Sequence, residues 1–505
     1  MFIQSNYRKH ILPSLFLLFV LGQVAFVWWL TWFPTQDGPC HIYNLAILKD
    51  LRNGGHVWGA WYEQHLTPTP NWGFHLIAYP LLSIVSPLTA EKIFISIYII
   101  LFSAAVPLSL KLLKLPLFPW SFLAAPAIWS YSLGMGFYSF VIALPLLTLA
   151  MALTIRMRTH GLMVRFIITT TASAILFVCH LIPFACFALF VLITQLIDIS
   201  VSPARRIVSA LALLAPSTAL LTLHMAASSG SPSILMPDFL SRIPFLILNA
   251  LACSTIYFSS LQGISGVALA FLLGFLIKQS TKNICSDYLP KLFGLYAVII
   301  AAFAIIAPPS LGGGGYFSQR LPTVMLIALI PLFASSHDRY HILLKKCVIP
   351  VIVLVLLFNF VVFFRMSALV DEFMSARRLS LQAGSVVMPY RKYGLPGSKL
   401  DVLAHATAHY ALRSTLIYAG NYEMQFSYFP VRYLPAVKAR TPSSDQVIYR
   451  GESTDFAHFG SIGYLIAWDA VLTPNALDRF NRIFQDRKLS VWVRSDPRGN
   501  RERIK

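Results

Sequence analysis

Charge is scarce in this 505-residue sequence, and acidic residues are the scarcest part of it. Charged residues make up 12% of the chain, about half the share of an ordinary soluble protein, whereas hydrophobic residues make up 57%. This composition excludes a typical soluble globular protein. The apolar stretches are long runs of Leu, Ile, Phe and Ala, so the short alternating strands of a membrane β-barrel are excluded as well.

The cysteines form no recognisable framework. No CxxC pair and no metal-ligand spacing occurs among them, and most lie inside apolar runs, so we expect buried thiols and not a disulfide scaffold. The six are Cys40, Cys179, Cys186, Cys253, Cys285 and Cys347.

The apolar runs reach the roughly 20 residues that cross a bilayer. Clusters of Lys and Arg in short loops mark the cytoplasmic side, and the loops between them are poor in both. This alternation predicts about eleven transmembrane helices, with the N-terminus inside and the tail after Arg365 outside. They are expected near 11–33, 91–113, 117–133, 136–155, 163–179, 181–198, 206–226, 264–279, 292–309, 317–335 and 347–366.

Three further features of the apolar part need an interpretation. The run at 11–33 is too long for a cleaved signal core, so we expect a retained helix. Residues 72–88 predict a half-buried or re-entrant segment, which is tolerated where it packs against protein. Residues 239–261 predict a helix lying along the outer face. The excess basic residues behind the net charge of +20 lie in the loops and the tail. This distribution predicts contact with membrane lipids and not with nucleic acid.

The composition changes after residue 366, where Pro, Gly, Tyr and charged residues become common and membrane-length runs end. Helical patterns occur at 367–382 and 400–417. Strand-like pieces occur at 446–450, 462–468 and 489–494. The predicted fold is therefore mainly α: a transmembrane domain over 1–366 with an outer loop at 34–72, and a C-terminal α+β extracytoplasmic domain over 367–505.

Asp37 is the acidic residue with the most informative surroundings. Residues 1–366 hold only eight Asp and Glu, and this one follows the first membrane-length run directly, in the stretch Gln36-Asp37-Gly38-Pro39-Cys40-His41. An ionisable group at a membrane boundary is a candidate for function. The apolar spacing after it predicts a short interfacial helix. Asp37 would then precede that helix, so a purely structural helix cap is an equally good interpretation of this residue alone.

The order of these features resembles the GT-C superfamily of membrane glycosyltransferases. A first helix is followed by an acidic residue, an interfacial helix in a long outer loop, many further helices and an outer soluble domain. The resemblance implies an inverting hexosyl- or pentosyltransferase of the bacterial inner membrane, with a periplasmic tail. It would transfer sugar from a polyprenyl-phosphate donor to a lipid, glycan or protein acceptor, with Asp37 and His41 as catalytic residues and Asp37 as base. Asp238 stands alone in its loop, so the sequence leaves a divalent metal open and predicts no other cofactor.

Departure of a phosphate also requires positive charge, and one outer loop supplies a candidate. In the stretch Gly312-Gly313-Gly314-Gly315-Tyr316-Phe317-Ser318-Gln319-Arg320, glycines allow close approach of a ligand. Arg320 could bind phosphate through two N–H groups, with Tyr316 and Gln319 beside it. The alternative is an arginine that extends toward lipid headgroups.

Several histidines are weaker candidates. His180 follows an apolar run and suits either the same outer cavity or a helix break. Glu63 and His65 suit a metal or a supporting role, although Glu-x-His is a weak signal. His405 and His409 are one helical turn apart, as in metal sites, but a surface pair is the more common outcome. The aromatic run 418–433, which contains Asn421 and Glu423, predicts core packing, with sugar stacking as the alternative.

Two other functions remain open from the sequence. A transporter or lipid-carrier flippase without covalent chemistry would show matching inverted halves with broken helices, and no such halves are evident. An assembly subunit without catalysis would use Asp37 only as a helix cap.

Overall fold

The computed structural model describes most of the chain. It covers residues 2–66, 69–227, 260–280, 287–307, 310–311, 314–335, 339–392, 394–395, 398, 400–426, 428–438, 447–448 and 462–495. These residues form two compact units. Unit 1 comprises residues 1–30, 68–77 and 92–362, and unit 2 comprises residues 31–67, 78–91 and 363–505.

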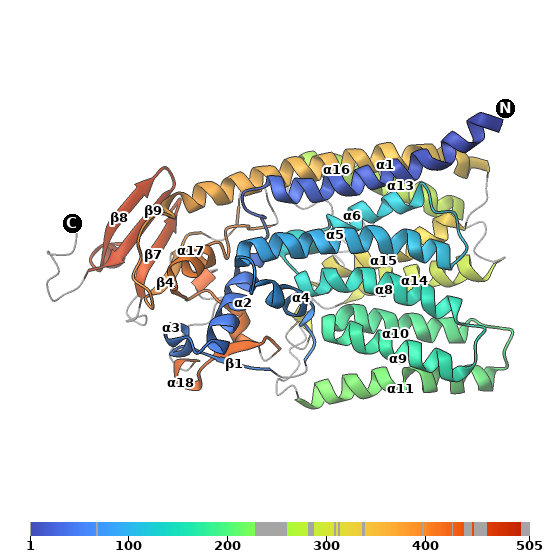
Figure 1. Cartoon of the computed structure of the whole chain (residues 1–505), viewed down its shortest axis with the longest axis horizontal. Helices are drawn as coiled ribbons and strands as arrows, with labels where there is room; N and C mark the ends of the chain where they lie inside the picture. Colours follow the sequence, from blue (N-terminus) through green and yellow to red (C-terminus); the bar gives the residue numbers. More distant parts are fainter. Residues whose placement is uncertain are drawn as a thin grey trace. The chain divides into compact units, whose positions relative to one another are not determined.

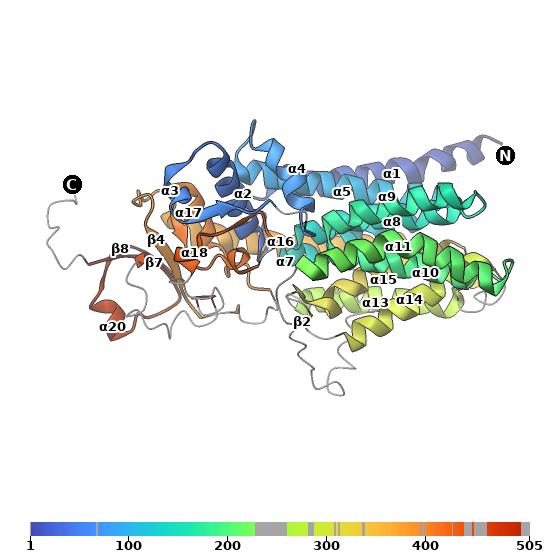
Figure 2. The same cartoon turned by 90° about the horizontal axis from the view of Figure 1, so that it is seen from below.

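Unit 1 is a bundle of long apolar helices, which run in nearly the same direction in two perpendicular views (Figures 1 and 2). They are α1 (Phe2–Trp29), α5 (Pro87–Leu112), α8 (Tyr138–Arg156), α9 (Leu162–Cys179), α10 (Leu181–Leu196), α11 (Pro203–Ala227), α13 (Ser260–Ser280), α14 (Tyr288–Ile306), α15 (Phe317–Ala334) and α16 (Arg339–Phe373). Within the described residues, nine helices are long and apolar enough to cross a membrane. The protein is therefore a polytopic helical membrane protein, as predicted.

Burial separates the centre of the bundle from its edge. In α8 and α15, 78% of the apolar segment is buried within the protein, whereas the figure for α11 is 17%. Leu211 and Leu223 on α11 are 67% and 69% exposed. A helix that is apolar all round and largely uncovered is stable where lipid replaces water, so α11 is a lipid-facing helix and α8 and α15 form the core.

Two of the eleven predicted crossings differ from the structure. The helix α10 has 16 residues, fewer than the length that a bilayer core requires. The expected crossing at 117–133 is wrong as a continuous helix, because it breaks into the 3-10 turn η1 (Trp120–Leu123), α6 (Ala124–Ile128) and α7 (Tyr131–Met135).

The broken segment has local causes. Ser130 is extended, with φ −81° and ψ 169°, and Gly136 after α7 adopts the left-handed conformation at φ 83°, which glycine tolerates best. All residues of η1, α6 and α7 are buried. Irregular backbone is admissible at membrane depth when protein covers it.

The two segments left unassigned by the charge pattern have different outcomes. Before α5 begins at Pro87, residues 72–88 contain α4 (Gly73–Leu81), whose nine residues span roughly 14 Å and cannot cross a bilayer. At its start, Trp72 N–H donates to the carbonyl of Val178 at 3.0 Å, and Phe74 N–H donates to Ser139 Oγ at 3.2 Å. This segment thus packs against protein, as predicted. Most of 239–261 lies outside the described residues.

Unit 2 combines two small sheets with short helices. The five-stranded sheet has the order β5-β4-β7-β9-β8, parallel from β5 to β7 and antiparallel from β7 to β8. Its strands are β4 (Val386–Tyr390), β5 (Ile417–Tyr418), β7 (Ile462–Trp468), β8 (Phe480–Asp486) and β9 (Leu489–Arg494). The predicted strands at 462–468 and 489–494 are confirmed, as is the α+β character of the tail. Most of 446–450 lies outside the described residues.

The helical predictions for the tail are confirmed in part. Helix α16 continues to Phe373 and is followed by the 3-10 turn η3 (Met374–Ala376), which covers the first half of 367–382. Within 400–417, only α17 (Thr407–Ser414) is helical. The short helices α18 (Pro435–Lys438) and α20 (Pro474–Leu477) complete the described helices of the tail.

Most of the predicted outer loop at 34–72 belongs to unit 2 and packs with the tail. Its elements are α2 (Gly38–Arg52), α3 (His56–Gly59) and β1 (Tyr62–Gln64). Strand β1 pairs antiparallel with β6 (Val431–Tyr433), and α2 lies beside α17 (Figure 1). A loop and a tail more than 300 residues apart in sequence therefore build one unit. The boundary between domains at residue 366 stays a prediction.

Candidate functional site

Asp37 occupies the position just before α2, but its carboxylate does not cap the helix. Its backbone carbonyl accepts hydrogen bonds from the N–H groups of Cys40 and His41 at 3.0 and 3.2 Å, whereas its side chain makes no capping hydrogen bond. The residue is 8% exposed. Tyr422 Oη donates a long hydrogen bond to Asp37 Oδ2 at 3.5 Å, and His405 Nε2 lies 3.8 Å from Oδ1. The helix-cap alternative thus lacks the contact that defines it.

One face of α2 meets a short stretch of the tail. Asp37, His41 and Asn44 recur with helical spacing, so they share one side of the helix. His41 Nδ1 lies 2.6 Å from Glu423 Oε1, and the Glu423 side chain is fully buried in the 3-10 turn η4 (Tyr422–Gln425). The amides of Asn44 and Asn421 donate to each other at 2.9 and 2.7 Å. This face is therefore polar, buried and matched to residues 421–423.

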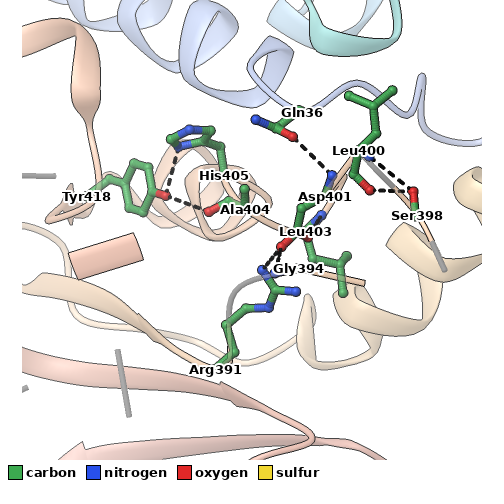
Figure 3. Close-up of polar contacts among 10 residues, drawn as sticks. All are labelled: Gln36, Arg391, Gly394, Ser398, Leu400, Asp401, Leu403, Ala404, His405 and Tyr418. Carbon is green, nitrogen blue, oxygen red and sulfur yellow. Dashed lines mark hydrogen bonds and ion pairs between the residues drawn. The ribbon is translucent and has the colours of Figure 1, made fainter. Parts of the chain in front are cut away.

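His405 is a neutral neighbour of Asp37. Burial, with a smaller contribution from charge at His41, lowers the pKa of His405 to about 3. Its Nδ1 lies 3.3 Å from both Cys40 Sγ and Tyr418 Oη, and Figure 3 shows the contact with Tyr418. At neutral pH the imidazole is uncharged, so its 3.8 Å approach to Asp37 is a weak dipolar contact and not an ion pair.

The remaining hydroxyl and thiol groups near Asp37 are also neutral. Burial is the main cause that raises the pKa of the Cys40 thiol, and the charges of Glu423 and Asp37 add to it. Burial and the charge of Asp37 likewise raise the pKa of Tyr422. Neither group gives up its proton near pH 7, so both can donate hydrogen bonds to a carboxylate but cannot act as bases there.

A third buried carboxylate belongs to Asp401, whose backbone contacts Gln36. Asp401 Oδ2 accepts hydrogen bonds from Arg391 Nη1 and from Gly394 N–H, both at 2.7 Å. The backbone N–H of Asp401 donates to Gln36 Oε1 at 3.0 Å (Figure 3). The Arg391 and Asp401 side chains are 4% and 2% exposed. This buried ion pair therefore anchors the residue that directly precedes Asp37.

Arg320 lies in the first turn of α15 in unit 1 and is 9% exposed, so it does not extend into solvent. Its guanidinium stacks over the ring of Phe137 at 3.8 Å from the centroid, and Nη1 lies 3.2 Å from His180 Nε2. Stacking on an aromatic face fixes the plane of the guanidinium.

His180 is placed by a helix start as well as by Arg320. It precedes α10, and its Nδ1 accepts from the N–H of Ile182 at 3.1 Å. A neutral imidazole with Nδ1 as acceptor carries its proton on Nε2, which then points a donor at the Arg320 guanidinium. Two N–H donors therefore face each other. A bound ligand with an oxygen atom that accepts a hydrogen bond from each of them would remove this mismatch.

The other predicted residues near Arg320 are only partly placed. Tyr316 precedes α15 in the left-handed conformation at φ 61°, is 36% exposed, and its ring lies 5.6 Å from that of Phe137. Gln319 is half-buried in the same turn. Gly314 and Gly315 form the strand β3 (Gly314–Gly315), paired with β2 (Ser310–Leu311), whereas Gly312 and Gly313 lie outside the described residues.

Glu63 and His65 lie on or beside β1. Glu63 faces Arg432 across the β1–β6 pair, with Arg432 Nε 2.7 Å from Glu63 Oε1, and the two side chains are 32% and 48% exposed. The backbone N–H of His65 donates to the carbonyl of Pro430 at 2.8 Å. Glu63 therefore forms a partly exposed ion pair with Arg432.

The paired histidines of the tail are not a surface pair, contrary to expectation, because His405 and His409 are each 5% exposed. They also diverge. His405 precedes α17 and faces Cys40, whereas the ring of His409 lies 4.8 Å from that of Trp32. Among the described residues, no group of three or more His, Cys, Asp or Glu is arranged to hold a metal ion.

An open cavity of about 770 Å³ in unit 2 contains none of the predicted site residues. Charged side chains of α16, of the residues just after η3 and of the β8–β9 hairpin line it: Arg365, Asp371, Glu372, Arg377, Arg378, Asp486 and Arg487. It lies outside the Asp37 cluster.

The main residues that the sequence did not single out for this site are Tyr422, Arg391 and Asp401, and Glu423 was considered only within an aromatic run. A signal for Glu423 was present. It is a lone acidic residue amid Tyr, Phe and Met, where a carboxylate becomes buried and requires a partner. Its partner, His41, could not be identified from spacing because 382 residues separate them.

With nine membrane-length helices among the described residues, the fold is that of a multi-pass membrane protein with a C-terminal α+β region. One solved structure similar to it is ArnT from Cupriavidus metallidurans in the apo state, with 11% sequence identity and a TM-score of 0.50. The match covers 95% of this chain and 98% of that one. No protein-family model matches the chain, and no curated protein sequence matches it significantly. The predicted resemblance to GT-C proteins is thus confirmed at the level of the fold.

Proposed function

We propose that the protein is an integral membrane glycosyltransferase that uses a polyprenyl-phosphate sugar and inverts the anomeric carbon. Its acceptor is a hydroxyl group of a lipid, glycan or protein on the outer side of a bacterial inner membrane. The observation that carries this proposal is the buried Asp37 carboxylate, which is not used as a helix cap. The shared fold supports the class of enzyme.

Asp37 acts as the general base in this proposal. The acceptor O–H bond breaks and its proton moves to the Asp37 carboxylate, while the acceptor oxygen forms a bond to the anomeric carbon. The bond from that carbon to the phosphate oxygen breaks, and polyprenyl phosphate leaves with the electron pair. His405, Cys40 and Tyr422 remain neutral throughout, so they do not compete for the proton. His41 supports Asp37 from one helical turn away.

Arg320 binds the donor phosphate in unit 1. Its guanidinium is fixed by Phe137, and His180 presents a second donor 3.2 Å away. A phosphate oxygen accepts from both, and negative charge that accumulates during departure strengthens both hydrogen bonds. Tyr316, just before the first turn of α15, and Gln319, within it, flank the phosphate in this proposal.

A transfer assay tests the class of enzyme. Purified full-length protein is incubated with a panel of polyprenyl-phosphate sugars and native lipid extract, and products are identified by mass spectrometry. We expect a sugar-bearing acceptor together with free polyprenyl phosphate. Movement of the donor between leaflets of a vesicle without any product would contradict the proposal and favour the flippase alternative.

A further inference from the structure

Gln36 and His41, which flank Asp37 along the chain, are both in contact with residues of the tail. Gln36, one residue before, accepts the N–H of Asp401 at 3.0 Å. His41, one helical turn after, lies 2.6 Å from Glu423. The backbone that carries Asp37 is therefore fixed on both sides by groups from the tail.

The tail groups are themselves rigidly placed. Asp401 accepts from Arg391, from Gly394 N–H and from Leu403 N–H, at 2.7, 2.7 and 3.1 Å (Figure 3). A buried carboxylate with three donors has little freedom to move. Glu423 is fully buried, and its neighbour Tyr422 donates to Asp37 itself. One turn of η4 thus contacts both Asp37 and the histidine that follows it.

Docking of the loop on the tail does not require these charges. The β1–β6 pair and the reciprocal amides of Asn44 and Asn421 already join the two segments. Burying an ion pair costs desolvation energy, and apolar residues of similar size often stabilise a contact at least as well. A buried carboxylate against His41 therefore indicates a role other than adhesion.

We infer that Glu423 and Asp401 are positioning residues for the Asp37 base, so that the C-terminal tail completes the catalytic apparatus of the first outer loop. This inference rests on the proposed role of Asp37. Glu423 holds His41, and Asp401 holds Gln36, and neither touches the reacting atoms. Their effect is on the direction in which the Asp37 carboxylate points, and a displacement of about 1 Å there can cost roughly 100-fold in rate.

Two variants of the full-length protein separate positioning from adhesion. Glu423→Gln and Arg432→Gln each remove one charged group of the tail that contacts the loop. Glu423 lies 2.6 Å from His41, and Arg432 lies 2.7 Å from Glu63. Arg432 differs in that it is 48% exposed and belongs to the β1–β6 pair. We expect Glu423→Gln to lower kcat about 10- to 100-fold with the donor KM changed less than about 3-fold. Arg432→Gln should retain wild-type kinetics. Glu423→Asp should restore part of the loss.

The combination with His41→Gln provides a second kinetic readout. Because the two residues act as a unit, the double variant with Glu423→Gln should lose no more activity than His41→Gln alone. Unchanged kcat in Glu423→Gln, or equal losses in Glu423→Gln and Arg432→Gln, would overturn the inference.

Amide hydrogen exchange gives a readout that does not depend on activity. Glu423→Gln should speed exchange at residues 38–45 and leave 46–52 and the melting temperature unchanged, whereas Arg432→Gln should leave 38–45 unchanged. If wild type transfers no sugar, the proposed function fails, and this exchange pattern alone decides whether the tail holds the backbone beside Asp37. Equal exchange in the two variants would refute the inference in that case.

Discussion

At the scale of single residues, different kinds of contact fix the orientation of the candidate site side chains. Arg320 lies flat on Phe137, and His180 is held at the start of α10. Arginine suits this place because its planar group can stack and donate two hydrogen bonds at once, whereas lysine offers a single charged point. The functional interpretation of Arg320 therefore depends on the shape of the group as well as on its charge.

Replacement of Arg320 tests this interpretation. Arg320→Lys keeps the charge but loses the planar fork, and we expect the donor KM to rise about 10-fold, because a charge-assisted hydrogen bond is worth roughly 1.5–3 kcal/mol. Arg320→Ala should raise it further. Arg165→Lys, a matched change of an arginine that contacts Gln195 on another helix of unit 1, should leave KM unchanged. Equal effects of the two lysine variants would contradict phosphate binding.

The sequence was sufficient to locate Asp37 but not its partners. Scarcity of acidic residues and the membrane-length run before it are local signals. Glu423 and Asp401 come close to Asp37 only through tertiary packing, and no spacing rule connects residues so far apart. Arg320 was identified because arginine at a helix start near the membrane is costly and therefore informative.

At the scale of elements, apolar length predicted most helices well and failed where the backbone is irregular. The segment 117–133 is apolar enough to cross, but an extended Ser130 and a left-handed Gly136 divide it. Strand β4 was missed because it contains Pro389, which cannot donate within a sheet and argues against a strand. Strand β8 was missed because its exposed Asn, Arg, Gln and Asp residues show no apolar run.

The histidines around α17 make unit 2 sensitive to acid. Burial lowers the pKa values of His405 and His409 to about 3, against about 6.5 in an unfolded chain. Below pH 6.5 the unfolded state binds protons that the folded state does not, so stability falls as pH falls. Each histidine should cost roughly 2 kcal/mol between pH 7 and pH 5.

Hydrogen exchange of peptides within 400–418, corrected for intrinsic rates, measures this effect. Protection should decrease from pH 7 to pH 5, and His409→Gln should remove about half of the decrease, provided the variant folds with a similar melting temperature at pH 7. Protection that does not depend on pH in wild type would show that the two side chains are not buried as neutral groups.

At the scale of the whole molecule, the chain comprises an apolar bundle and a mixed unit made from residues 31–67, 78–91 and 363–505. The bundle and the α+β tail could be anticipated, because hydropathy and composition change sharply at residue 366. The inclusion of residues 31–67 in the same unit as the tail could not, because it depends on β1–β6 pairing and on the buried face of α2. The tail thus supplies side chains that contact Asp37 and His41.

The most direct test of this account compares Asp37→Asn with Asp50→Asn in the transfer assay. Both variants replace one carboxylate of the first loop by an amide, at opposite ends of α2. The account predicts that Asp37→Asn lowers kcat at least about 100-fold while the protein remains folded, since a general base contributes 10²–10⁴-fold, and that Asp50→Asn stays within about 2-fold of wild type. Wild-type kcat in Asp37→Asn would contradict the central claim that Asp37 is the catalytic base.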